Sequence, residues 1–139
     1  MEETYISIML QSLKKKAAVL DEIIRLDDLQ KDRLTDSECP VEDFDQTVED
    51  KGKLIEQLGQ LDSGFEKLYA QVSEELQDNK EQYADEIRQM QSLIRSITDK
   101  SVKIQAQEAR NKDLMMQKFG VIKKHAKNVR MNSKAITGY

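Results

Sequence analysis

Apolar residues recur at alternating steps of three and four along almost the whole chain, which is the spacing of one face of an α-helix. Three such runs predict helices over about residues 2–34, 40–77 and 80–112. The first run consists of Ile6, Leu10, Leu13, Ala17, Leu20 and Ile24. No run shows the strict alternation of a β-strand. The pattern therefore predicts an all-α protein.

Residues that cap or interrupt helices separate these runs. Pro40 suits the first turn of a helix, where its missing N–H has no partner to lose, and Glu42 and Asp43 favour the positive helix start. Gly59 and Gly64 lie inside the second run. Each costs about 1 kcal/mol relative to alanine, so they mark either a bend or a close helix contact. We expect one continuous second helix.

Helices of roughly 33 to 37 residues are each on the order of 50 Å long. Short connections between helices of equal length favour antiparallel neighbours, because only side-by-side packing buries all three apolar stripes. The stripes repeat every seven residues, which indicates left-handed, coiled-coil-like packing. The predicted fold is an elongated antiparallel three-helix bundle over residues 1–112, followed by a basic amphipathic C-terminal segment over residues 113–139.

Composition agrees with long exposed helices. Of the 139 residues, 35% are charged and only 5% are aromatic. No stretch approaches the roughly 18 apolar residues of a membrane span, and the start of the chain lacks the pattern of a signal peptide. Cys39 is the single cysteine, which excludes an internal disulfide framework. We therefore expect a soluble, cytoplasmic protein without stable membrane insertion.

Residues for catalysis are scarce. His125 is the only histidine, and no acid lies near it in the sequence. The "GKL" at Gly52 lacks the preceding glycine and the strand of a phosphate-binding loop. The seven carboxylates between Asp36 and Asp50 lack the order of a calcium loop. The sequence therefore predicts no enzyme, with no catalytic, cofactor-binding or metal-binding residue.

Charge is divided unevenly along the chain. Residues 110–139 contain eight Lys and Arg and one Asp, although the whole chain has a net charge of −4. Such asymmetry indicates an interaction segment. Its apolar positions keep the helical spacing: Met115, Phe119, Ile122, Ala126, Val129, Ser133 and Ile136. Ordering the segment costs about 1 to 2 kcal/mol of conformational entropy per residue, and so thin a stripe buries too little apolar area to offset that cost. We therefore expect the segment to fold against a partner.

Several partners fit a basic amphipathic segment. The stripe could continue the third helix or dock on the acidic side of its own bundle. Nucleic acid is disfavoured because the rest of the chain is acidic and would repel a polyanion. A membrane surface is disfavoured because the segment has few aromatic anchors. A protein partner fits best, and the predicted partner-binding residues are Met115, Met116, Phe119, Ile122, Lys123, Ala126, Lys127, Val129, Arg130 and Ile136.

The layout resembles the FlgN-type flagellar export chaperones. The resemblance rests on "LDEIIRLDDLQKDRL" at the end of the first helix, on Pro40 and Phe44 in an acidic turn, and on "VEDKGKLIEQLGQLDSGFEKLY". Further points of resemblance are Lys51, Leu54 or Ile55, Leu58 and Leu61 in the second helix, and Asn111 in "EARNKDLMM". It spans residues 5–118.

The resemblance implies a bacterial cytoplasmic chaperone that binds hook-associated proteins, at the junction of hook and filament, before type III secretion. It also implies that the C-terminal amphipathic segment contacts the client and that export-apparatus proteins are further partners. The alternative is a structural coiled-coil scaffold or adaptor that self-associates through its helices, as a homodimer for example.

Overall fold

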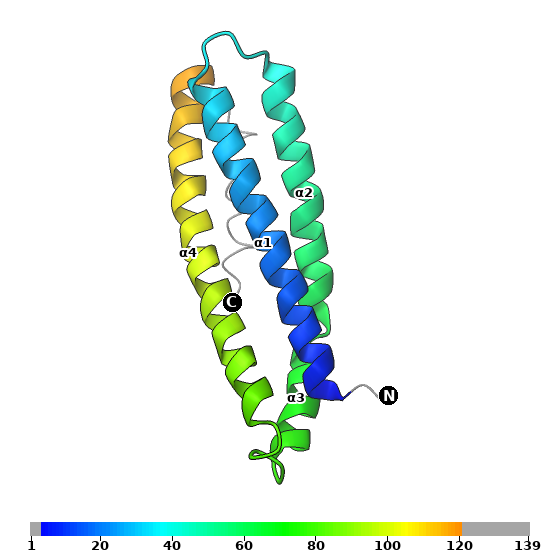
Figure 1. Ribbon diagram of the computed structural model, residues 1–139. Helices are drawn as coiled ribbons and strands as arrows, with labels where there is room; N and C mark the ends of the chain where they lie inside the picture. Colours follow the sequence, from blue (N-terminus) through cyan, green and yellow to red (C-terminus); the bar gives the residue numbers. More distant parts are fainter. Residues whose placement is uncertain (1–3, 121–139) are drawn as a thin grey trace.

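Four helices and no strand form residues 4–120, the part of the chain that the structure, a computed structural model, describes (Figure 1). The helices are α1 (Tyr5–Thr35), α2 (Val41–Ser63), α3 (Phe65–Leu76) and α4 (Ala84–Phe119). In Figure 1 the chain ascends along α1, descends along α2 and α3, and ascends again along α4. The predicted all-α class is confirmed.

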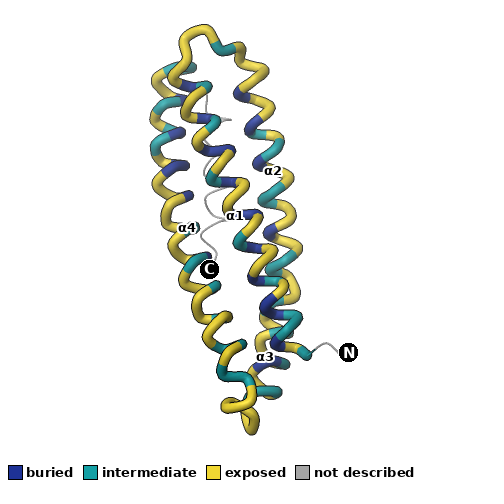
Figure 2. The backbone as a smooth tube through the Cα atoms, in the orientation of Figure 1, coloured by how far each residue is buried: buried dark blue, intermediate teal, exposed yellow. Residues whose placement is uncertain are grey.

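The central element is α1, which packs against each of the other three helices. No Cα atom of α4 lies within 8 Å of a Cα atom of α2 or α3. Buried positions accordingly follow α1 along its whole length (Figure 2). They repeat at steps of three and four: Ile6, Met9, Leu13, Lys16, Leu20, Ile23, Asp27, Gln30 and Leu34. Lys16, which the sequence pattern placed away from the apolar face, is therefore part of the interior.

The predicted second helix is two helices, and the expectation of one continuous helix was wrong. The division falls at Gly64, which has φ −99° and ψ 0° instead of helical values. A Cβ atom at Gly59 or Gly64 would meet nothing within 4 Å, so neither glycine serves a close helix contact. The low helix propensity of glycine lets the backbone step out of the helix here, and both α2 and α3 still pack against α1.

The third helix runs beyond its predicted end at residue 112, as far as Phe119. The last turns are held by a small apolar cluster, in which Met115 and Phe119 pack against Leu34 of α1 and Phe44 of α2. Sequence periodicity could not show this cluster, because its members come from three different helices. It forms where α1 and α2 connect.

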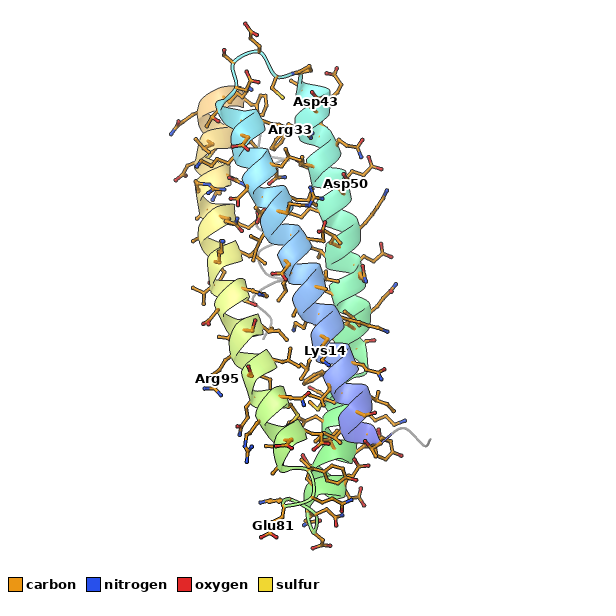
Figure 3. The ribbon with its side chains drawn as sticks, in the orientation of Figure 1. Lys14, Arg33, Asp43, Asp50, Glu81 and Arg95 are labelled. Carbon is orange, nitrogen blue, oxygen red and sulfur yellow. The ribbon has the colours of Figure 1, made fainter. Side chains whose placement is uncertain are left out.

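Polar contacts fasten both ends of α1. Lys118 donates from Nζ to the carbonyl oxygens of Arg33 at 3.0 Å and Asp36 at 2.6 Å, where a cation suits the negative helix end. Arg33 donates to the carbonyl oxygen of Asp43 at the start of α2 (Figure 3). At the other end, the Glu75 carboxylate of α3 accepts from the backbone N–H groups of Tyr5 and Ile6, both at 3.3 Å.

Gly120 ends α4 with a backbone conformation that other residues avoid. Its φ is +70° and its ψ is −161°, a combination that is essentially restricted to glycine. The chain therefore leaves α4 in a new direction instead of prolonging the helix.

We predict that Gly59→Ala raises the free energy of unfolding by about 1 kcal/mol, because it adds helix propensity inside α2 and its Cβ meets open space. Urea denaturation measures the change. Ala106→Gly at an exposed position inside α4 is the matched control and should lower stability by a similar amount. A destabilised Gly59→Ala variant would show that the backbone at this position depends on glycine.

Candidate functional site

The structure describes three of the ten predicted partner-binding residues. Met115 is only 2% exposed, and Phe119 is half-buried with its ring centroid 5.6 Å from that of Phe44. Met116 is 38% exposed. Met115 and Phe119 thus lie in the last turns of α4 and contact the bundle itself. This agrees with the alternative in which the apolar stripe continues the third predicted helix. The other seven lie outside the described residues: Ile122, Lys123, Ala126, Lys127, Val129, Arg130 and Ile136.

A second face of α4, apolar except at Thr98, Gln105 and Lys112, lies beside the face that α1 covers. Its exposed large side chains are Ile94, Val102 and Met116, with Val102 60% exposed. At 100° per residue, positions 94, 98, 102, 105, 109, 112 and 116 fall within about 80° of one another. The side chains that contact α1, such as Lys100 and Arg110, lie on the opposite flank. This second face therefore points away from α1, and its Ile94 and Thr98 line a cavity together with Phe65 of α3.

The facing wall of α2 is smooth and partly apolar. The same count along α2 places on one flank Val41, Val48, Gly52, Ile55 and Gly59. Val41 is 50% exposed, and a Cβ atom at Gly52 or Gly59 would meet nothing within 4 Å. We call the space between this flank and the second face of α4 the α2–α4 groove. The Cα atoms on its two sides stay more than 8 Å apart, and side chains meet between them: Lys51 bonds to Glu108, and Val48 packs against the cluster that contains Met115.

Near the start of α3 lies a cavity of about 180 Å³. Its lining comes from α1, α3 and α4: Leu13, Lys16, Phe65, Ile94, Ile97 and Thr98. The Lys16 Nζ lies 3.3 Å from Asp62 Oδ1, and burial lowers the pKa of Lys16 to about 8 although the Asp62 charge opposes this. The cavity thus combines apolar walls with one lysine, whose partner Asp62 is partly exposed.

Acidic residues border the groove on its solvent side. By the same helical count, the outer edge of α2 carries Glu42, Asp45, Glu49 and Glu56, and the outer edge of α4 carries Asp99 and Asp113. All six are exposed. An occupant with an apolar stripe between basic residues would match both the walls and the rims.

The floor of the groove contains a buried polar cluster that holds three helices together. Lys51 of α2 is 1% exposed. Its Nζ donates to Glu108 Oε1 of α4 at 2.6 Å, to Asp27 Oδ1 of α1 at 3.0 Å and to Gln30 Oε1 at 3.1 Å. Asn111 of α4 donates to the Asp27 carbonyl at 2.8 Å and to Gln30 Oε1 at 3.3 Å. Through these bonds α2 and α4 are joined although their backbones stay apart.

Two carboxyls share the single ammonium of Lys51. Burial, with a smaller contribution from the Glu108 charge, raises the pKa of Asp27 to about 7, against the attraction of Lys51. Asp27 Oδ2 and Glu108 Oε2 are buried, and no described residue donates a hydrogen bond to either oxygen. A proton held between the two neighbouring carboxyls would satisfy both oxygens and leave one negative charge for the ammonium.

Sequence reasoning did not identify this cluster, although a signal was present. Asp27, Lys51, Glu108 and Asn111 each occupy a position where the apolar stripe of their helix calls for an apolar residue. Four polar residues at positions of the apolar stripe, with opposite charges among them, indicate a buried ion network. Lys51 and Asn111 also carried the family resemblance, so the resemblance lies partly in this cluster.

The described residues offer little for chemical catalysis. Between residues 4 and 120, no three His, Cys, Asp or Glu side chains are placed to hold a metal ion. None of the helices in that range combines the length and the apolar content needed to cross a membrane. The groove offers a surface for binding rather than a set of reacting groups.

Comparison with known proteins gives one match. The family model described as FlgN protein matches residues 1–139, the whole chain. No curated protein and no solved structure matches the chain.

We predict that Lys51→Met destabilises the protein by about 3 to 5 kcal/mol, because it leaves two buried carboxyls without their cation. Urea denaturation measures the loss. Lys53→Met, at an exposed position of the same helix, should change stability by no more than about 0.5 kcal/mol. Equal effects of the two substitutions would contradict a structural role for the cluster.

We also predict that stability declines as the pH rises from about 4 to about 7. The pKa of Asp27 is about 7 in the folded protein and about 3.8 in the unfolded chain. The folded state therefore binds more protons between these two pH values, and it loses this advantage as the pH rises. Asp27→Asn should reduce the decline, as measured by urea denaturation at several pH values. The exposed control Asp45→Asn should show the same decline of stability with pH as the unsubstituted protein. If Asp27→Asn also shows that decline, the proton belongs to another group.

Proposed function

Since the chain belongs to the FlgN protein family, we propose that it is a cytoplasmic flagellar export chaperone that binds the helical ends of hook-associated proteins before type III secretion. The family supports the chaperone class. The client and its mode of binding are argued from the α2–α4 groove and the C-terminal segment.

The observation that carries the proposal is the α2–α4 groove. Both α2 and α4 pack on α1 while their Cα atoms stay more than 8 Å apart, which leaves apolar side chains such as Val41, Ile94 and Val102 exposed on their outer flanks. A fourth helix in this position would complete a four-helix arrangement, and an amphipathic helix laid in an apolar groove is a common mode of peptide recognition. A client helix that must not pair prematurely is an occupant of this kind.

The C-terminal segment supplies the second half of the proposed site. Its apolar stripe at Ile122, Ala126, Val129 and Ile136 would cover the side of the client helix that the groove leaves open. Lys123, Lys127 and Arg130 would meet acids of the client or of the export apparatus. Apolar burial would supply most of the affinity, whereas the charges would chiefly accelerate encounter and weaken with salt.

Binding of this type needs no chemical step. The client would be held while its helices lack their partners and released at the export apparatus as the contacts are exchanged. The acidic rims at Asp45 and Glu49 argue against nucleic acid as the partner, because they would repel phosphates.

We predict that the double substitution Ile122→Asp with Val129→Asp reduces capture of a purified hook-associated protein by at least about tenfold, because it places charge in the apolar stripe. Titration of the labelled client measures the dissociation constant. These positions avoid Met115 and Phe119, whose packing in the bundle would confound the result.

The matched control is Asn128→Asp with Asn132→Asp, which adds the same charge on the polar side of the segment. Its effect should be small. Equal losses of affinity in both variants would mean that added charge weakens binding wherever it lies on the segment. Unchanged affinity in both variants would show that the segment does not contribute to client binding. A stable oligomer in light scattering that dissociates on removal of residues 121–139 would favour the self-associating scaffold instead.

A further inference from the structure

We propose that the cavity between α1, α3 and α4 is an anchor pocket for one aromatic side chain, which a helix of the client carries. The identity of the partner as a hook-associated protein rests on the proposed function. The pocket, and the chemical group that fits it, are derived from the described residues alone and can be tested without a client.

The cavity lies where the helical line of α2 and α3 is interrupted. Phe65, the first residue of α3, directly follows Gly64 and forms one wall. The other walls come from α1 and α4: Leu13, Lys16, Ile94, Ile97 and Thr98. Ile97 is buried, whereas Ile94 and Thr98 are exposed, so the cavity reaches the protein surface along α4. A side chain from outside can therefore enter it.

The size of the cavity selects a single side chain. Its volume is about 180 Å³, whereas pockets for drug-sized ligands and cofactors measure about 300 to 1,000 Å³. An apolar cavity of about 150 Å³ is large enough to bind benzene. One aromatic ring therefore fits, and a cofactor does not.

The lining favours an apolar group over water. A buried water makes about three hydrogen bonds, and only Lys16 and Thr98 contribute polar side-chain atoms here. Both are already engaged: the Thr98 hydroxyl donates to the carbonyl oxygen of Ile94 at 2.9 Å, and Lys16 Nζ lies 3.3 Å from Asp62 Oδ1. Water in such a cavity is poorly held, and its displacement by an apolar group favours binding.

Two wall residues favour an aromatic group over an aliphatic one. Phe65 offers a ring against which a second ring can pack edge to face or offset. Lys16 adds a cation, which the face of an aromatic ring attracts. Burial lowers the pKa of Lys16 to about 8, and this attraction is stronger for a cation that is poorly hydrated. The expected occupant is therefore a Phe or Tyr side chain.

Exposed apolar side chains continue from the cavity along both helices. Tyr69 lies four residues after Phe65, and Val102 lies four residues after Thr98, so each is a surface neighbour of a lining residue. Because α3 descends and α4 ascends in Figure 1, Tyr69 and Val102 lie toward opposite ends of the cavity. Apolar surface grouped in this way is typical of an interaction site. A helix that inserts one aromatic side chain would cover both neighbours.

Two carboxylates lie beside the cavity on the side of α2 and α3. Asp62 is partly exposed beside Lys16, and Glu66 is exposed next to Phe65. A Lys or Arg one helical turn from the aromatic residue of the partner would lie near these carboxylates, because residues four apart share one face of a helix. The partner is therefore expected to present an amphipathic helix with one aromatic anchor and a neighbouring basic residue.

Binding of benzene to the full-length chain tests the pocket. We expect benzene to cause saturable shifts of the methyl NMR resonances of Leu13, Ile94 and Ile97. Thr98→Trp should weaken this binding at least about tenfold, because Thr98 is exposed and a large ring at this position covers the cavity. The matched control Ser92→Trp adds the same ring at an exposed position on the flank of Lys100 and should leave benzene binding unchanged.

Two results with benzene would overturn the proposal. If the unsubstituted protein shows no saturable shifts, the cavity does not accept an aromatic ring. If Thr98→Trp binds benzene as tightly as the unsubstituted protein, the ring binds at another place in the bundle.

Titration of a purified hook-associated protein tests the partner. Thr98→Trp should weaken capture of this client at least about tenfold, whereas Ser92→Trp should not. Unchanged capture by Thr98→Trp would overturn the assignment of the pocket to the client. The proposed function would still stand in that case, provided that Ile122→Asp with Val129→Asp reduces capture. If the unsubstituted protein captures no hook-associated protein, the proposed function fails together with the partner, and benzene binding alone then supports the pocket.

Discussion

The arrangement of this protein depends on one buried cation. Lys51 sits among Asp27, Gln30 and Glu108, and in doing so connects α2 with α4 across a distance at which their backbones make no contact. Apolar residues in this place would tolerate several registers, whereas an ammonium that must meet three particular oxygens tolerates one. The cluster thereby fixes the positions of the two groove walls relative to each other.

The groove follows from the central position of α1. A helix with buried positions along its whole length can hold several neighbours, and the backbones of those neighbours then need not approach one another. The outer flanks of α2 and α4 consequently form a surface on which apolar residues, two glycines and exposed acids lie together. The chain belongs to the FlgN protein family, and we propose that this surface takes part in holding a client.

Sequence periodicity anticipated the helical class and most helix boundaries, because alternating steps of three and four residues are a local property of a helix that packs on others. It placed the start of the second helix near Pro40 correctly. It missed the division at Gly64, since glycine permits a break without requiring one. It also placed Met115 and Phe119 in a separate segment, because the residues that bury them, Leu34 and Phe44, are distant in the sequence.

The sequence by itself determined which residues are apolar, where charge accumulates and that the chain carries the pattern of the FlgN family. Only the tertiary structure decided which face of each helix is covered. Periodicity gives the angle of a residue around its own helix, but the neighbour at that angle depends on long-range packing. For this reason Lys51 on α2 and Glu108 on α4 meet only once both helices lie against α1.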